Sequence, residues 1–143
     1  MNSSDPNPAG AAVSRKDAVL IVDDERPLLD VYCAALAPFF EVTTAPNASA
    51  ADASLQTKTF KVVLADHLMP GESGMDFLIR ARRNFPHMQR VLVTGYLKPD
   101  MLLRGVNEAL LFRYLLKPVL MSELVKVVRE AVKAHDQSAA TAS

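Results

Sequence analysis

The chain has 143 residues, half of them hydrophobic, and its 16 basic and 16 acidic side chains give a formal net charge of zero. That length and composition suit a single soluble domain, and the balanced charge argues against nucleic-acid binding, which needs concentrated basic patches. The single cysteine, Cys33, excludes an internal disulfide and a cysteine-based metal site. Because no apolar run approaches the roughly 18 residues of a membrane helix, we expect a cytoplasmic protein with no membrane and no direct nucleic-acid partner.

Short apolar runs and amphipathic segments alternate five times, which predicts an α/β domain with a parallel sheet covered by helices on both faces. Residues 1–17 are polar and rich in Pro, Ser, Asn and Gly, so they are predicted to form a disordered lead. Residues 135–143 are predicted to be a flexible tail, which leaves one domain at 18–134. In chain order we expect strands at 18–22, 39–44, 62–65, 90–94 and 112–116, and helices at 27–38, 46–56, 74–85, 99–108 and 122–134.

Local signals refine these elements. Pro27 falls in the first turn of its helix, where a missing N–H costs no hydrogen bond. Asn47 and Ser122 are expected to cap the helices that they begin. The strand at 39–44 has mixed polarity, which indicates an edge of the sheet, and Gly105 is expected to weaken the helix that contains it.

Four of the five predicted strands end in a side chain with a functional group. In chain order these residues are Asp23 and Asp24, then Asp66, Thr94 and Lys117. The carboxyl ends of parallel strands meet at one edge of the sheet, where open α/β proteins bind their ligands. Neighbouring strands lie about 4.8 Å apart, so we expect these groups to converge within a few ångströms if the strands that carry the acids are adjacent.

The convergence of carboxylates predicts a bound metal ion. Several carboxylates in one dry pocket cannot all stay ionised without a counter-charge, and Mg²⁺ is the hard cation that a few carboxylates and several waters hold. Lys117 adds a positive charge for phosphoryl oxygens, and Thr94 adds a hydrogen-bond donor. The site therefore suits attack of one carboxylate on phosphorus, which gives an acyl phosphate. The histidines are interpreted as solvated side chains outside it: His67, His87 and His135.

Four motifs at these strand ends resemble the receiver domain of two-component response regulators. They are DDE at 23–25, D-x-x-M-P-x-x-x-G at 66–74, Thr-Gly at 94–95 and Y-x-x-K-P at 114–118. The motifs occur in the order of that family, and the resemblance covers most of the predicted domain. It implies a flavodoxin-like (βα)5 fold of the chemotaxis-regulator type, a doubly wound parallel sheet with strand order 2-1-3-4-5.

The resemblance assigns roles to the acidic residues. It implies that Asp66 is the phosphorylation site and a metal ligand, that Asp24 binds Mg²⁺ directly, and that Asp23 helps through water. The backbone carbonyl of Leu68 would complete the protein ligands. Apart from self-phosphorylation and autodephosphorylation at Asp66, it implies no enzyme activity.

The resemblance also implies a switch and its partners. Lys117 would pair with the phosphoryl group, placed by a cis bond to Pro118. Thr94 would move to hydrogen-bond a phosphoryl oxygen, and Tyr114 would turn inward behind it. The responding surface would be the fourth helix, fifth strand and fifth helix. The phosphoryl donor would be a sensor histidine kinase or a histidine phosphotransfer protein, with an unknown downstream effector and a homodimer that forms on phosphorylation.

Two residues depart from the usual pattern of the family. Leu68 and Tyr96 lie two positions after Asp66 and Thr94, where the family often has polar side chains that affect the access of hydrolytic water. These bulky groups are expected either to shield an acyl phosphate and lengthen its lifetime, or only to pack the loops.

Three rival functions share parts of this pattern. A flavin-binding electron carrier needs a Ser-, Thr- or Gly-rich phosphate loop after the first strand, where this chain has DDER at 23–26. A haloacid-dehalogenase-type phosphatase has its acids as D-x-D and a cap domain, and the acids here are adjacent. A phosphate-independent receiver-like docking module also fits, although the complete set of site residues favours phosphorylation.

The segment 93–118 looks most like receivers joined to cyclic-di-nucleotide phosphodiesterase or kinase modules. No such module follows within the 143 residues. The chain is therefore interpreted either as a stand-alone receiver that signals by docking, or as the N-terminal receiver of a longer regulator.

Overall fold

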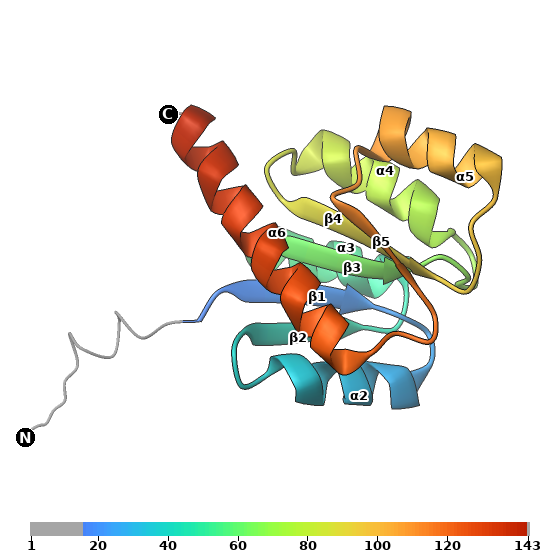
Figure 1. The fold of residues 1–143 in the computed structure, drawn as a ribbon, viewed down its shortest axis with the longest axis horizontal. Helices are drawn as coiled ribbons and strands as arrows, with labels where there is room; N and C mark the ends of the chain where they lie inside the picture. Colours follow the sequence, from blue (N-terminus) through green and yellow to red (C-terminus); the bar gives the residue numbers. More distant parts are fainter. Residues whose placement is uncertain (1–15, 143) are drawn as a thin grey trace, which may run out of the picture.

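The computed structural model of the chain describes residues 16–142, which form one five-stranded parallel sheet covered by helices (Figure 1). The strand order is β2-β1-β3-β4-β5. The predicted fold class and strand order are therefore confirmed. Most of the predicted disordered lead at 1–17 lies outside the described residues, so its disorder stays a prediction.

The elements alternate as the sequence predicts, with one addition after the fourth helix. In chain order they are β1 (Ala18–Val22), α2 (Arg26–Leu36), β2 (Glu41–Ala45), α3 (Ala48–Thr57), β3 (Val62–Asp66), α4 (Gly74–Asn84), β4 (Gln89–Thr94), α5 (Pro99–Arg104), the π-helix η1 (Gly105–Ala109), β5 (Arg113–Leu116) and α6 (Met121–Ala142).

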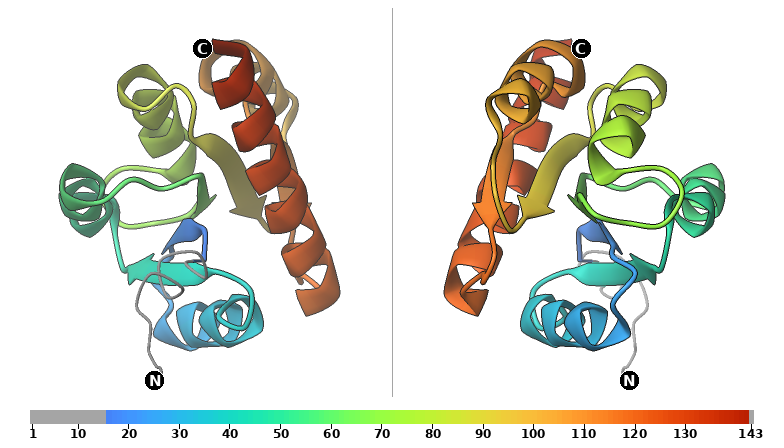
Figure 2. Two further views of the ribbon diagram at one scale, coloured as in Figure 1. Left: turned by 90° about the vertical axis from the view of Figure 1, so that its left-hand side faces the viewer. Right: turned by 90° about the vertical axis from the view of Figure 1, so that its right-hand side faces the viewer.

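The two faces of the sheet build two separate hydrophobic cores. Successive side chains of a strand point to opposite faces, so Leu20 of β1 packs with α3, α4 and η1, whereas Ile21 packs with α2 and α6. Figure 2 shows α6 on one side of the sheet and α3 and α4 on the other. The central strand β3 is buried along its whole length, which explains its continuous aliphatic sequence. The edge strand β2 is only partly buried, as its mixed polarity predicts.

Helix starts follow the capping signals in two cases. The side chain of Asn47 accepts a hydrogen bond from the Ala50 amide at 2.8 Å, so the predicted cap of α3 is confirmed. Pro27 lies in the first turn of α2, also as predicted. The strand predicted at 39–44 begins later, because the amides of Phe39 and Phe40 bond to the end of α2 rather than to β1.

The last helix differs from the prediction at both ends. It begins at Met121, so Ser122 lies inside the helix and is not its cap. It continues to Ala142, past the expected end at residue 134. The Ala-rich tail favours helix, and Asp136 accepts a hydrogen bond from Lys61 at 2.8 Å, which ties this segment to the start of β3. Although α6 has 22 residues, neither it nor any other helix within 16–142 is long and apolar enough to cross a membrane.

The helix predicted at 99–108 changes its hydrogen bonding partway along. Its first six residues are α-helical, and from Gly105 to Ala109 the backbone follows a π-helix, which ends at Leu110 with a positive φ of 46°. The expected weak point at Gly105 is therefore the boundary between the two kinds of helix. We refer to this continuous segment, residues 99–109, as α5–η1.

Candidate functional site

The polar strand ends meet at the carboxyl edge of the sheet. In register, Val22 of β1 lies beside Ala65 of β3, so the acids that follow each of them, Asp23 and Asp66, are neighbours. The carboxylates of Asp23, Asp24 and Asp66 each offer an oxygen within 4.8 Å of the others. Asp23 and Asp66 are buried, whereas Asp24 is exposed at the mouth. The expected convergence of the acids is confirmed.

Lys117 supplies the positive charge of this site. Its Nζ lies 2.6 Å from Asp66 Oδ1 and 3.9 Å from Asp23 Oδ2. The peptide bond to Pro118 is cis, as predicted, and the Lys117 amide donates to the Thr94 carbonyl at 2.8 Å. Burial disfavours the charged ammonium, but the hydrogen bond and charge of Asp66 outweigh that effect, so the pKa of Lys117 is raised. The lysine therefore remains charged against the acids at neutral pH.

Asp23 has the chemistry of a metal ligand. Its Oδ1 accepts a hydrogen bond from the Glu25 amide at 2.9 Å, but its buried Oδ2 has no hydrogen-bond partner among the described residues. Burial, followed by the charges of Asp66 and Asp24, raises the pKa of Asp23 to about 6 despite the Glu25 amide and Lys117. An unpartnered buried oxygen beside two further carboxylates fits a hard cation with oxygen ligands such as Mg²⁺.

A cavity of about 300 Å³ opens onto this cluster. Two of the three acids line it, together with the lysine, the threonine hydroxyl, the two bulky side chains noted in the sequence and two further residues. The full lining is Asp24, Glu25, Asp66, Leu68, Thr94, Gly95, Tyr96 and Lys117. The sequence reasoning missed Glu25 as a lining residue, although its place directly after Asp24 was a signal. Both bulky side chains lie at the mouth, with Leu68 62% and Tyr96 44% exposed.

The two predicted switch residues lie on neighbouring strands, Thr94 at the end of β4 and Tyr114 in β5. Thr94 is buried, and its Oγ1 donates to the Tyr96 carbonyl at 2.9 Å and accepts from the Tyr96 amide at 3.4 Å. Tyr114 does not reach the acids. Its hydroxyl donates to the carbonyls of Met101 and Leu102, at 3.0 and 3.2 Å, beneath α5–η1.

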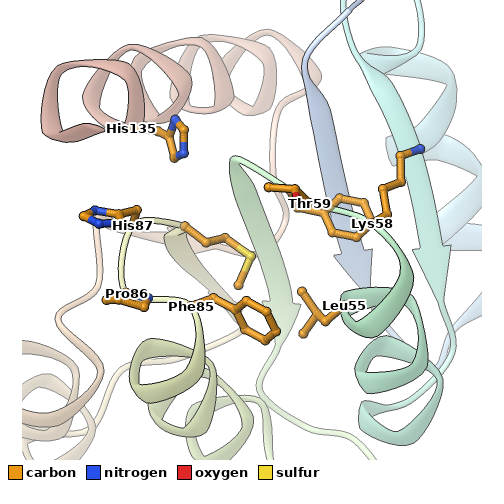
Figure 3. Close-up of a pocket in the computed structure, with 9 residues that line it drawn as sticks. Leu55, Lys58, Thr59, Phe85, Pro86, His87 and His135 are labelled. Atoms are coloured by element: carbon orange, nitrogen blue, oxygen red, sulfur yellow. The ribbon is translucent and has the colours of Figure 1, made fainter. Parts of the chain in front are cut away.

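The three histidines lie outside the acidic cavity, but not all are solvated. His67 is half-buried, and its Nδ1 has no hydrogen-bond partner among the described residues. His135 was expected to be exposed, yet its side chain is only 16% exposed, because it bonds Asp136 and covers a second cavity. That cavity, about 200 Å³ and largely apolar, lies between the C-terminal ends of α3 and α4 and His135 of α6, and it shares no residue with the acidic cavity (Figure 3).

Comparison with known proteins agrees with this geometry. Residues 19–129 match the profile of the response regulator receiver domain. The chain is 37% identical over 121 residues to the hydrogenase transcriptional regulatory protein HoxA of Cupriavidus necator, covering 85% of this chain and 25% of that protein. It is 30% identical over 125 residues to the DNA-binding transcriptional regulator NtrC of Azospirillum brasilense, with the same two coverages. The chain thus spans about a quarter of the length of these relatives.

Solved structures show the same architecture. The signal receiver domain of an HD domain-containing protein from Pseudomonas fluorescens superposes with a TM-score of 0.82 at 26% identity, covering 86% of this chain and 99% of that one. A CheY-like response regulator receiver domain protein from Methanospirillum hungatei superposes with a TM-score of 0.81 at 27% identity, covering 86% and 98%. The similarity therefore extends over nearly the whole of each solved chain.

Proposed function

The chain belongs to the response regulator receiver domain family of two-component systems, and from that premise we propose that Asp66 accepts the phosphoryl group. The observation that carries this proposal is the position of Lys117 Nζ, 2.6 Å from the carboxylate of Asp66, in a cavity that also holds Asp24. Asp66 is thus the buried acid that combines a cationic partner with an opening to solvent. The donor is the phosphohistidine of a sensor kinase or of a phosphotransfer protein.

The reaction transfers one phosphoryl group. A carboxylate oxygen of Asp66 forms the new P–O bond, the P–N bond of the donor breaks, and its electron pair remains on the donor imidazole. Lys117, already beside that carboxylate, stabilises the negative charge on the phosphoryl oxygens. The chain's own chemistry ends with this transfer and with hydrolysis of the acyl phosphate at Asp66.

The acidic cluster is suited to Mg²⁺. Asp24 and Asp66 would hold the ion directly, Asp23 would do so through water, and the backbone carbonyl of Leu68 would complete the protein ligands. The unpartnered Oδ2 of Asp23 and the raised pKa of that acid support this assignment. When bound, Mg²⁺ neutralises charge on the acids and on the incoming phosphoryl group.

Phosphorylation of Asp66 is sensed by Thr94 and read out on a surface away from the acids. Thr94 lines the cavity, so its hydroxyl can exchange the Tyr96 carbonyl for a phosphoryl oxygen, and Tyr114 follows it inward. The responding surface is formed by α5–η1, β5 and α6. It carries exposed apolar side chains that suit a protein partner or a second copy of the chain: Leu103, Val106 and Leu116, with Leu120 just before α6.

The output of the whole protein is a separate proposal. The relatives named above are transcriptional regulators about four times as long as the matched segment. We therefore favour an N-terminal receiver of a longer regulator over a stand-alone receiver. The second candidate function is a docking module that acts without phosphate, for which the exposed apolar surface is the supporting observation.

One experiment tests the phosphoacceptor role. The protein is incubated with acetyl phosphate and Mg²⁺, and its intact mass is measured for the wild type, for Asp66→Asn and for wild type with a chelator. We expect one phosphoryl group on the wild type only. Modification of neither protein, also with a cognate kinase, would leave the docking module as the better function.

A further inference from the structure

Two polar side chains lie on the face of β4 that α5–η1 covers. Arg90, Leu92 and Thr94 are every second residue of β4 and so share one face, and the central Leu92 packs in the core that contains Met101 and Ala109 of α5–η1. Arg90 and Thr94 therefore point toward the same helix, one at each end of the strand. Tyr114 lies beside Leu92 in register, between these two.

Arg90 holds the C-terminal end of the helix. Its Nε donates to the Ala109 carbonyl at 2.7 Å and its Nη2 to the Leu110 carbonyl at 3.1 Å, while Nη1 donates to the Met88 carbonyl on its own side. The last carbonyls of a helix lack partners within the helix, so the guanidinium acts as their cap. The Arg90 carbonyl also accepts from the Phe112 amide at 2.8 Å, which fixes the chain just after the helix.

The burial of Arg90 makes this contact costly to lose. The residue is 4% exposed, and no carboxylate within the described chain forms an ion pair with it. Burial, together with the nearby charge of Arg82, lowers the pKa of Arg90 to about 10, so it remains charged at neutral pH. A buried charge whose compensation is backbone carbonyls fixes those carbonyls in place.

Gly105 marks the point where the helix can bend. Its N–H is shared between the carbonyls of Met101 and Leu102, the same two that accept from the Tyr114 hydroxyl. A Cβ at Gly105 would lie 1.9 Å from that hydroxyl, so glycine is what makes room for the tyrosine. Gly105 also lies where α-helical bonding gives way to π-helical bonding, and glycine adopts other backbone conformations more readily than other residues do.

We propose that Arg90 is a fixed anchor and Gly105 a hinge, so that movement of α5–η1 on phosphorylation is confined to the part before residue 105. This inference rests on the proposed function, since Thr94 and Tyr114 start the movement. Arg90 is a positioning residue: it touches neither the phosphoryl group nor the acids. It keeps residues 105–110 on the sheet while the α5 end responds.

The anchor is tested first without phosphorylation, by hydrogen exchange of the amides in 105–112. Arg90→Met is compared with Arg82→Met, whose guanidinium donates at 3.4 Å to the neighbouring Glu108 carbonyl but is more exposed. We expect exchange in 105–112 to be roughly tenfold faster or more in the Arg90 variant and nearly unchanged in the Arg82 variant. Equal protection in both would overturn the anchor. Arg90→Lys, which keeps the charge with fewer donors, replaces the methionine variant if that one does not fold, with the same expectation.

The hinge is tested by the difference in exchange on phosphorylation with acetyl phosphate and Mg²⁺. In the wild type we expect changes in 95–104 and none in 105–112, and in Arg90→Lys we expect the change to spread into 105–112. Equal changes on both sides of Gly105 in the wild type, or identical difference maps for the two proteins, would overturn it. Absence of a phosphoryl mass would refute the proposed function and the hinge with it, whereas the first comparison would still decide whether Arg90 is an anchor.

Discussion

Lys117 and Asp66 form a direct ion pair, with Nζ 2.6 Å from Oδ1, at the ends of two strands that are separated in the sheet by β4. The pair lies in a cavity open to solvent, and its lysine is also 3.9 Å from Asp23. The ammonium therefore serves as the built-in counter-charge of the acids. An incoming cation or phosphoryl group must share the carboxylate of Asp66 with it.

Replacing this lysine separates its two effects. In Lys117→Met the acids lose a cation that repels Mg²⁺, so we expect Mg²⁺ to bind several-fold more tightly. The phosphoryl oxygens lose a charged donor, so phosphorylation by acetyl phosphate should slow by about 100-fold. Calorimetric titration and the rate of mass increase measure the two effects, with Lys126→Met on the exposed face of α6 as control. Weaker Mg²⁺ binding in Lys117→Met would contradict the assigned charge balance.

The pKa of Asp23 predicts an unusual pH dependence of stability. Its folded pKa of about 6 lies above the unfolded value of 3.8, so the folded protein binds the extra proton between these values. Without Mg²⁺ this group therefore destabilises the fold above pH 6, and that cost, roughly 1–3 kcal/mol, is relieved as the pH falls toward 4. Urea unfolding with a chelator at pH 7.5 and 5.5 should show the relief in the wild type but not in Asp23→Asn. The same trend in both proteins would assign it to other groups.

Bound Mg²⁺ should reverse this pH dependence of the free energy of unfolding. The ion competes with the proton for the acidic cluster, so its affinity should fall as the pH drops through about 6, where Asp23 takes up its proton. Titration of the wild type with Mg²⁺ across this range measures the effect. An affinity independent of pH would mean that Asp23 takes no part in holding the ion.

The contact between Gly105 and Tyr114 predicts a specific steric effect. In Gly105→Ala the new Cβ would lie 1.9 Å from the tyrosine hydroxyl, so Tyr114 must leave its place, at a cost of about 1–3 kcal/mol in the free energy of unfolding. Adding Tyr114→Phe should recover part of this loss, because the closest atom is removed. Gly95→Ala is the matched control, since its Cβ would meet nothing within 4 Å. Equal losses in the two alanine variants would contradict the steric role.

Leu68 and Tyr96 at the mouth of the cavity predict a long-lived phosphorylated state. The apolar side chain of Leu68 offers an attacking water no hydrogen-bond partner, so Leu68→Asn should shorten the lifetime several-fold while the unfolding free energy changes little. Loss of the phosphoryl mass over time after removal of acetyl phosphate gives the rates. Loss within seconds from the wild type would show that these side chains only pack the loops.

The acidic site was predictable because topology alone brings it together. In a parallel sheet every strand ends at the same edge, and the strand order implied by the family resemblance places the first strand beside the third, so Asp23, Asp66 and Lys117 were expected to meet. The buried position of Arg90 was not predictable, because an arginine at the start of a strand has the sequence pattern of an exposed residue. Its partners are carbonyls 19 and 20 residues away, which no local signal marks.

The differences in the helices have similar long-range causes. The Tyr114 hydroxyl contacts the chain at Gly105, where the π-helix begins, and Lys61 bonds Asp136 in the last turns of α6, 75 residues away. Intrinsic propensity at 135–142 was too weak to distinguish helix from a free tail without that contact.

The position of the phosphoryl group on the chain tests the central claim most directly. After treatment with acetyl phosphate and Mg²⁺, borohydride reduces an aspartyl phosphate to homoserine, which peptide mass spectrometry locates. We predict homoserine at residue 66 and unchanged aspartate at 23 and 24, with no homoserine in Asp66→Asn. Homoserine at another residue, or its absence from a wild type that carries the phosphoryl mass, would contradict the assignment of Asp66 as the phosphoacceptor.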